Sequence, residues 1–262
     1  MKGLRSGADL AVLQPFARKL TSLGIGDAEA QQSLLQCVKV GGGIGRGGDI
    51  VGQGHNRKHV TILLEGIACL YELLKDGRRQ IYSFYYRGDF CGLHGFVEST
   101  DEQLVGALTD CSVGSIPYEE VDRALERHPQ LATALWRSTI LEAGIVRERL
   151  INISHRSALE RVAHLLCEQL HLRRTIGIES PIIPLTQIDL ADAVGLSVVH
   201  INRVFQELRG LGALSRNGRV LEVTDRDRLM KAANFDARYL NMPEALARWD
   251  LEMKTDISVT EL

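Results

Sequence analysis

Two short helices joined by a tight turn are predicted by residues 186–205, whose sequence is TQIDLADAVGLSVVHINRVF. Thr186 and Asp189 have the spacing of a capping box, in which each side chain satisfies a backbone N–H group of the other residue, although a short acid replaces the usual Glu or Gln. Gly195 permits a positive φ in the turn, and Ser197 is a preferred capping residue for a second helix. The side chains expected to face inward are Ile188, Leu190, Ala191 and Val194 in the first helix and Ile201 in the second. Together these features indicate a helix-turn-helix, and the alternative is an ordinary helical hairpin on a protein surface.

A β-hairpin is predicted directly after this unit, over residues 214–223. Asn217-Gly218 lies between two short runs that favour strands, and this dipeptide is typical of a type I′ turn. Arg216 and Arg219 flank the predicted tip, where cations would meet a phosphate backbone. A helix-turn-helix followed by such a hairpin is a winged helix, so double-stranded DNA is the expected partner.

The whole chain has the composition of a globular protein. Of its residues, 45% are hydrophobic and 24% are charged. A length of 262 residues is enough for two domains with separate cores. The formal net charge is only −2, so any attraction to DNA must come from local clusters of cations. No apolar run approaches the roughly 18 residues that span a bilayer, and no signal-peptide pattern opens the chain. We therefore expect a cytoplasmic protein without a membrane partner.

Cysteine and histidine spacing does not indicate a metal site. The cysteines are odd in number and scattered, at Cys37, Cys69, Cys91, Cys111 and Cys167. Buried reduced thiols are the expected state, with a redox-sensing cysteine as the alternative. His55 and His59 lack a third ligand and are expected in a solvated loop. His94 follows a turn and lies between apolar neighbours. It either lines an internal pocket or is a structural histidine with its hydrogen bonds satisfied.

The first 128 residues change from helical to strand periodicity. One or two short helices are expected within residues 9–36, and short apolar runs separated by turn residues follow from about Val38. The predicted strands are 50–51, 60–64, 67–74, 80–85, 104–108 and 112–116, with turn glycines at 48, 54, 66, 77 and 88. This pattern predicts a small antiparallel barrel or jelly roll. Residues 43–48 match G-x-G-x-x-G, but a strand follows them instead of the helix N-terminus that a dinucleotide site requires.

A long helix is predicted over residues 129–153, after a short helix from Glu119 to His128. Apolar side chains recur at spacings of three and four along it, a heptad seam formed by Trp136, Thr139, Ala143, Val146, Leu150 and Ile153. A second stripe contains Leu131, Leu135 and Ile145. Two stripes favour two partners, the barrel and a second copy of the helix in a parallel homodimer, and the alternative is a plain core helix. Arg147, Glu148 and Arg149 would lie beside the seam and set its register.

The remaining segments complete the winged helix. Residues 154–172 predict an amphipathic helix capped by Ser154 or Ser157, and Ile182-Ile183 predicts a short strand. A further helix is expected after Thr224-Asp225, and residues 241–262 form a poorly patterned tail.

This order of parts resembles the Crp/Fnr family of bacterial transcription regulators over about residues 38–225. The motifs that carry the resemblance are GDIV at 48–51 with Gly54, LEG at 64–66, DGR at 76–78, GDF at 88–90, and the stretch from LTQ at 185–187 through Arg203 to Leu208. The resemblance implies an α+β fold with an N-terminal β-roll or jelly-roll domain, a long dimerisation helix and a C-terminal winged helix-turn-helix domain. The corresponding divisions are a cyclic-nucleotide-binding-like β-roll sensor domain at 1–128, the dimerisation helix at 129–153, the DNA-binding domain at 154–240 and the tail at 241–262.

The resemblance also implies which residues contact DNA. Arg203 would bind a guanine, whereas Ser197 and Thr186 would touch phosphate. The complete expected set is Thr186, Gln187, Ser197, Val198, Val199, His200, Asn202, Arg203, Arg216 and Arg219. Many relatives carry Glu where this chain has Val199. RNA polymerase is a candidate partner.

The chain departs from the family pattern at the ligand site. Cyclic-AMP-binding members have Gly-Glu-Leu followed by an Arg-Ser pair, whereas this chain has Gly92-Leu93-His94 and then Asp101-Glu102-Gln103. Acids thus replace the cationic phosphate partner, and the N-terminal cysteine cluster of oxygen-sensing members is absent from the sequence. We expect no cyclic AMP binding, no cofactor, no metal and no catalytic residue, and the effector is unassigned. The alternatives are a regulator that binds a cyclic nucleotide through altered contacts and a ligand-binding β-roll enzyme.

Overall fold

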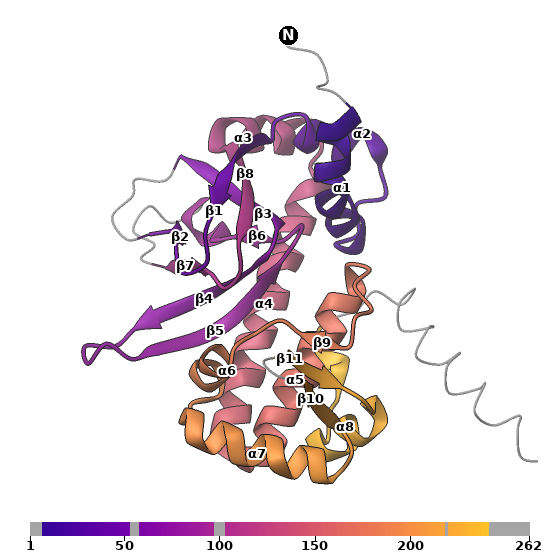
Figure 1. Cartoon of the computed structure of the whole chain (residues 1–262). Helices are drawn as coiled ribbons and strands as arrows, with labels where there is room; N and C mark the ends of the chain where they lie inside the picture. The colour runs from indigo at the N-terminus through magenta and orange to yellow at the C-terminus, as the bar shows by residue number, and fades with distance from the viewer. Residues whose placement is uncertain (1–6, 53–57, 97–102, 218–219, 241–262) are drawn as a thin grey trace, which may run out of the picture.

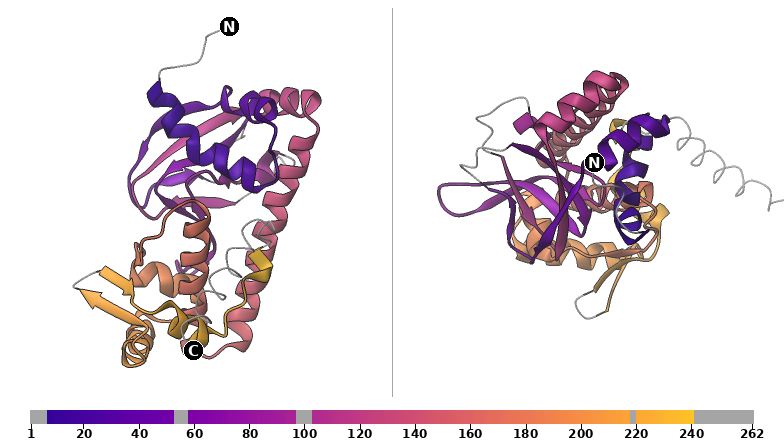
Figure 2. Two further views of the ribbon diagram at one scale, coloured as in Figure 1. Left: turned by 90° about the vertical axis from the view of Figure 1, so that its right-hand side faces the viewer. Right: turned by 90° about the horizontal axis from the view of Figure 1, so that it is seen from above.

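A β-roll and a winged helix are joined by one long helix in the computed structural model, which describes residues 7–52, 58–96, 103–217 and 220–240 (Figure 1). Helices α1 (Gly7–Ser22) and α2 (Ala28–Leu35) pack beside the roll. Figure 2 shows the long helix running along the whole molecule, past the roll to the winged helix. His55, Gly54, Asp101, Glu102, Arg219 and the expected tail lie outside the described residues.

The roll consists of two four-stranded antiparallel sheets within the described part of the chain. One sheet has the order β1 (Lys39–Ile44), β8 (Cys111–Pro117), β3 (His59–Glu65) and β6 (Phe90–Cys91). The other has the order β2 (Asp49–Val51), β7 (Leu104–Ala107), β4 (Ile67–Leu73) and β5 (Arg79–Tyr86). The predicted jelly-roll architecture is confirmed.

The sequence did not predict strands β1 and β6. The β1 strand contains Gly41-Gly42-Gly43 and lies at a sheet edge, so it lacks the alternation of apolar side chains that marks a half-buried strand. The β6 strand is only Phe90–Cys91, and the 3₁₀ helix η1 (Leu93–Phe96) follows it. Strand β2 directly follows the G-x-G-x-x-G match, as the sequence predicts.

Two of the predicted turn glycines are required by close backbone approach. Gly66 has a φ of +92°, and a Cβ atom there would lie 2.5 Å from the carbonyl oxygen of Asp110. Gly88 has a φ of +95°, and its Cβ would lie 2.5 Å from the carbonyl oxygen of Pro15 in α1. A side chain at either position would be strained by its conformation and would separate packed backbones.

The long helix α4 (Gln130–His155) follows α3 (Tyr118–Arg127) and is longer than predicted. Its second stripe packs within the chain, with Leu131 and Ile145 buried and Leu135 half-buried. Ser154 lies in the last turns of α4 and is not a cap. Ser157 instead caps α5 (Ala158–Thr175) in a capping box with Glu160, so the expected helix start at residue 154 is wrong. The reason is that the apolar pattern continues across the junction while the backbone turns only at Arg156 and Ser157.

The winged helix contains the elements predicted from residues 182–233. They are β9 (Ile182–Ile183), α6 (Gln187–Val194), α7 (Val198–Gly210), β10 (Leu214–Asn217), β11 (Val220–Val223) and α8 (Arg226–Ala233). The 3₁₀ helix η2 (Ala237–Leu240) follows them and was not predicted. The three strands form an antiparallel sheet, and α5 packs against α6, α7 and α8. None of the helices among the described residues is both long and apolar enough to span a membrane.

A buried polar network joins α4 to α5. Arg149 and Glu168 form an ion pair at 2.5 Å with both side chains almost inaccessible, and Tyr239 of η2 donates to Glu168 at 2.7 Å. Glu148 pairs with Arg156 at 2.6 Å. The expectation that Glu148 and Arg149 set the register of a seam is therefore wrong, because Arg149 pairs with α5 and Glu148 pairs with Arg156 at the helix junction of the same chain. Arg147 is exposed.

His164 of α5 is buried within this network in the neutral form. Its Nε2 atom lies 3.3 Å from Glu148, and its ring stacks on Tyr239. Burial lowers the pKa of His164 from about 6.5 to about 3, and the nearby cations Arg156 and Arg149 act in the same direction. Protonation therefore favours the unfolded chain.

We predict that His164 makes stability depend on pH. Between pH 6.5 and pH 3 the unfolded chain binds a proton that the folded chain excludes, so this contribution is complete above pH 6.5 and declines as the pH falls, by at most about 1.4 kcal/mol per pH unit. Chemical denaturation of wild type and His164→Gln between pH 7.5 and 4.5 measures the difference. The exposed His155→Gln variant is the control, and equal slopes for wild type and His164→Gln would contradict the assignment.

Candidate DNA-binding site

The first helix of the helix-turn-helix, α6, begins with the predicted capping box. The backbone N–H of Asp189 donates to Thr186 Oγ1 at 3.2 Å, and the backbone N–H of Thr186 donates to Asp189 Oδ2 at 3.0 Å. Leu190, Ala191 and Val194 are buried as expected. Ile188 is 58% exposed, so its expected inward orientation is wrong. The reason is that two residues turn the helix by about 200°, which places Ile188 opposite Leu190.

The turn and the second helix also follow the sequence prediction. Gly195 adopts the left-handed conformation with a φ of +66°, and its N–H donates to the carbonyl of Ala191. Ser197 caps α7 by accepting from the backbone N–H of His200 at 3.2 Å. Ile201 is completely buried against the first helix and its neighbours.

The exposed end of α7 carries most of the expected DNA contacts. Ser197, Val198, His200 and Arg203 are exposed, and Val199 is 65% exposed. Asn202 is half-buried, and its side-chain amide donates to the carbonyl of Val198 at 3.1 Å. Gln187 is half-buried at the start of α6.

The predicted hairpin is confirmed, because β10 and β11 form an antiparallel pair in which Asn217 lies opposite Val220. Gly218 and Arg219 of the predicted tip lie outside the described residues. The turn type lies outside the described residues. Arg216 belongs to β10, one residue before the strand ends.

The sequence analysis missed two arginines that the β-roll places against α6. Arg79 of β5 and Arg46, from the segment between β1 and β2, both contact Asp189. Arg46 also lies 3.5 Å from Thr186 Oγ1. No local pattern signals these contacts, because they join residues that are more than 100 positions apart in the chain.

Side chains from both sheets of the roll pack against one another. Residues from both sheets form one buried cluster, which contains Val51, Leu63, Ala68, Leu70, Tyr85, Cys91, Val105, Ala107 and Cys111. The hydroxyl group of Tyr85 donates to Glu142 of α4 at 3.1 Å. His94 is half-buried, with Nδ1 at 3.2 Å from Gln103 Oε1. This favours the structural interpretation of His94.

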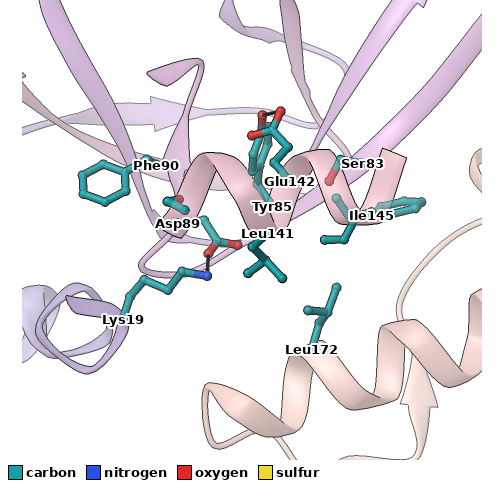
Figure 3. A pocket seen from close by; sticks show the side chains of 11 residues that line it. Lys19, Ser83, Tyr85, Asp89, Phe90, Leu141, Glu142, Ile145 and Leu172 are labelled. Atoms are coloured by element: carbon teal, nitrogen blue, oxygen red, sulfur yellow. Dashed lines mark hydrogen bonds and ion pairs between the residues drawn. The ribbon is translucent and has the colours of Figure 1, made fainter. Parts of the chain in front are cut away.

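A small cavity lies between α1, β5, α4 and α5 (Figure 3). Lys19 and Asp89 form an ion pair at 2.6 Å on one side, and the Tyr85–Glu142 pair lies on another. The cavity volume is about 30 Å³, compared with the roughly 10–15 Å³ that one water molecule requires. It can therefore hold a few water molecules but not a nucleotide.

Comparison with known proteins matches both halves of the molecule. The model of the cyclic nucleotide-binding domain matches residues 44–128, and that of the Crp-like helix-turn-helix domain matches residues 160–232. The transcriptional activatory protein AadR of Rhodopseudomonas palustris is 32% identical over 181 residues, which cover 68% of this chain and 72% of AadR. The chain belongs to the Crp/Fnr family of transcriptional regulators.

Other Crp/Fnr proteins agree with this assignment. The nitrogen fixation regulation protein FixK of Bradyrhizobium diazoefficiens is 35% identical over 161 residues, which cover 58% of this chain and 65% of FixK. The structure of FixK2 from Bradyrhizobium japonicum has a TM-score of 0.65 at 26% identity and covers 74% of this chain and 97% of that chain. The family consists of transcription regulators and not of enzymes, which removes the alternative of a β-roll enzyme.

The cysteines of this Crp/Fnr protein are free thiols. Burial raises the pKa of Cys69 and of Cys167 to about 12, and burial likewise raises the pKa of Cys91 and Cys111. Because the thiolate is the reactive form, these four thiols are poor nucleophiles at neutral pH. Within the described ranges, no group of three or more His, Cys, Asp or Glu side chains is arranged to hold a metal ion.

Proposed function

We propose that this protein is a homodimeric transcription regulator that inserts the N-terminal end of α7 into the major groove of a specific DNA site. The observation that carries the proposal is the exposed surface at the start of α7, where a capped helix presents Val199, His200 and Arg203 to solvent. In helix-turn-helix proteins this end of the second helix contacts base edges. Phosphate contacts from Thr186, Gln187, Ser197 and the wing arginines Arg216 and Arg219 would hold it in register.

The proposed dimer interface is the heptad seam of α4. Trp136 is 67% and Leu150 is 63% exposed in the single chain, and Val146 and Ala143 are also exposed. The neighbouring Ile140 and Ile151 extend this apolar surface, whereas Thr139 and Ile153 are half-buried. Apolar residues repeated along one face of a 26-residue helix are what a parallel helix pair buries. A second copy of α4 would cover them and bring two recognition helices to successive grooves.

We predict that Leu150→Glu dissociates the dimer. Each protomer would lose the burial of one leucine, worth about 1.5–3 kcal/mol, so the dimer dissociation constant should rise by at least about a hundredfold. Sedimentation equilibrium at micromolar concentration measures it. Leu73→Glu, at an equally apolar and exposed position on β4, is the matched control and should remain dimeric. A wild-type monomer that binds a single half-site with full affinity would contradict the proposal, since a dimer requires two half-sites with centres about 34 Å apart.

Base recognition is proposed to depend on Arg203 and Val199. The guanidinium of Arg203 can donate to O6 and N7 of one guanine, which is worth about 1–3 kcal/mol of discrimination. Val199 accepts no hydrogen bond, so it cannot select the amino group of a cytosine as a glutamate would. Its methyl groups can pack against a thymine methyl, with His200, Asn202 and DNA shape contributing further. The alternative is that Val199 merely spaces the helix from the groove.

We predict that Arg203→Ala weakens specific binding more than non-specific binding, and that Val199→Glu adds a preference for cytosine. Binding to all four base pairs at each half-site position, starting from DNA fragments selected by the purified protein, measures both effects. A strong cytosine requirement in wild type that Val199→Glu does not enhance would contradict this account of α7.

The β-roll is proposed to act without cyclic AMP. The departure of Gly92-Leu93-His94 and Asp101-Glu102-Gln103 from the pattern of cyclic-AMP-binding members supports this proposal, and Tyr85 between the roll and α4 is bonded to Glu142. Asp101 and Glu102, the acids in place of the phosphate partner, lie outside the described residues. The competing proposal is a regulator that binds a cyclic nucleotide through altered contacts.

We predict that titration calorimetry with cyclic AMP gives no binding at physiological concentration. Loss of a charge-assisted contact in a buried site costs about 2–5 kcal/mol, which removes most of the affinity of a small anionic ligand. A micromolar dissociation constant would contradict the prediction and support the altered-contact alternative.

The proposed location is the cytoplasm, where bacterial chromosomal DNA lies. RNA polymerase is proposed as a partner because AadR and FnrL, two of the similar proteins, are named as activators.

A further inference from the structure

Four charged side chains connect the β-roll to the first helix of the winged domain. They are Arg46 and Arg79 of the roll and Asp189 and Asp192 of α6, and we call them the α6 bridge. Figure 1 shows α6 beside β5, and the contacts between these two elements agree. We propose that Arg79 is a positioning residue for DNA recognition, which through the α6 bridge sets the orientation of the helix-turn-helix relative to α4 and thereby the half-site spacing that the dimer binds.

The guanidinium of Arg79 binds two carboxylates at once. Its Nη2 lies 2.9 Å from Asp189 Oδ1, and its Nε lies 2.9 Å from Asp192 Oδ2. Asp189 and Asp192 lie about one helical turn apart on α6, so a single planar guanidinium fixes two points along one helix. Arg46 adds a third contact at 2.8 Å to Asp189 Oδ2.

The bridge is shielded from solvent at its centre. The side chain of Asp189 is only 4% exposed, and those of Arg79 and Asp192 are about one quarter exposed. Burial by itself raises the pKa of Asp189, but hydrogen bonds from Thr186, Arg79 and Arg46 outweigh it and hold the pKa below its usual value. Two cations therefore face two anions, and loss of one partner leaves a shielded charge without compensation.

Asp189 also belongs to the capping box, which links the bridge to the DNA-binding end of α6. The same carboxylate that accepts from Arg79 and Arg46 accepts from the backbone N–H of Thr186. The roll thus holds the helix at its capped N-terminus, beside the threonine proposed to touch phosphate.

Arg79 is itself fixed within the roll. Its guanidinium lies over the ring of Tyr71 on β4, 5.9 Å from the ring centroid. The hydroxyl group of Tyr71 donates to Asp49 of β2 at 3.0 Å. Three strands of the same sheet therefore support the arginine that holds α6, so the bridge transmits the position of the sheet to the helix.

The consequence for DNA binding rests on the proposed homodimer. Because only residues 195–197 connect α6 to α7, a tilt of α6 displaces the recognition helix of that protomer. One base pair of added spacing shifts a half-site by about 3.4 Å and about 35° around the DNA axis. A dimer with both helix-turn-helix units held by their bridges should reject such a shift, whereas units free to tilt should tolerate it.

The test compares Arg79→Gln with Arg78→Gln. Arg78 is the adjacent arginine, is largely exposed and pairs with Asp76 in its own turn, so its replacement removes the same charge without touching the bridge. Binding is measured to two selected half-sites at the optimal spacing and at spacings one base pair shorter and longer. Coupling between side chains of one salt-bridge network changes an equilibrium constant by about two- to a hundredfold. We therefore expect the affinity for optimal spacing, divided by the affinity for altered spacing, to be at least about threefold lower in Arg79→Gln than in wild type.

The same ratio should be unchanged in Arg78→Gln, and non-specific DNA affinity should change by less than about twofold in both variants. Asp192→Asn should lower the ratio less than Arg79→Gln, because Arg79 keeps its contact with Asp189. The double variant should show no more than the effect of Arg79→Gln, because the arginine makes both contacts. Unchanged spacing discrimination in Arg79→Gln, or full additivity in the double variant, would overturn the proposal.

A second measurement does not involve DNA. Amide hydrogen exchange of α6 should be faster in Arg79→Gln than in wild type and Arg78→Gln, with exchange of the roll core unchanged. If wild type shows no spacing preference, the homodimer proposal fails while this measurement still tests the bridge. Equal exchange of α6 in Arg79→Gln and wild type overturns the bridge itself.

Discussion

The structure depends on the two apolar stripes of α4, of which a single chain can bury only one. Leu131 and Ile145 pack within the chain and hold the helix in place. Trp136 and Leu150 remain in solvent along the opposite stripe. Since exposed aromatic and aliphatic side chains in a continuous row are a liability for a monomer, this helix is the main physical argument for a second copy. It also determines where the winged helix is placed, because α5 continues directly from its end.

The junction between α4 and α5 carries an unusual concentration of buried polar groups. The Arg149–Glu168 pair and the neutral ring of His164 are excluded from water there, and the half-buried Tyr239 donates to Glu168. Such a network requires each charge to keep its partner, so it favours one angle between the helices over alternatives that an apolar junction would allow. Together with the α6 bridge, it holds the winged helix at two separate places.

The β-roll supports the helix-turn-helix through side chains on its surface. Its two sheets share a buried apolar cluster, and Arg79 and Arg46 on its surface contact the helix-turn-helix. A displacement of strands β4 and β5 would be transmitted to α6 through the same arginines. The roll can therefore influence DNA binding without contacting DNA.

Local sequence was enough to predict the helix-turn-helix, because each of its signals acts within a few residues. The Thr186–Asp189 capping box, the left-handed Gly195 and the Ser197 cap all depend on the backbone within one turn. The seam of α4 and most strands of the roll follow from apolar periodicity in the same way, whereas the glycine-rich β1 and the two-residue β6 carry no such pattern. The prediction that Ile188 faces inward was wrong. Approximate spacing of apolar residues along a helix does not tell which of them points to solvent. Arg79 and Arg46 could not be found from the sequence at all. Their contacts with Asp189 join segments more than 100 residues apart, and only the packing of the roll against the winged helix decides which of many surface arginines meets a carboxylate.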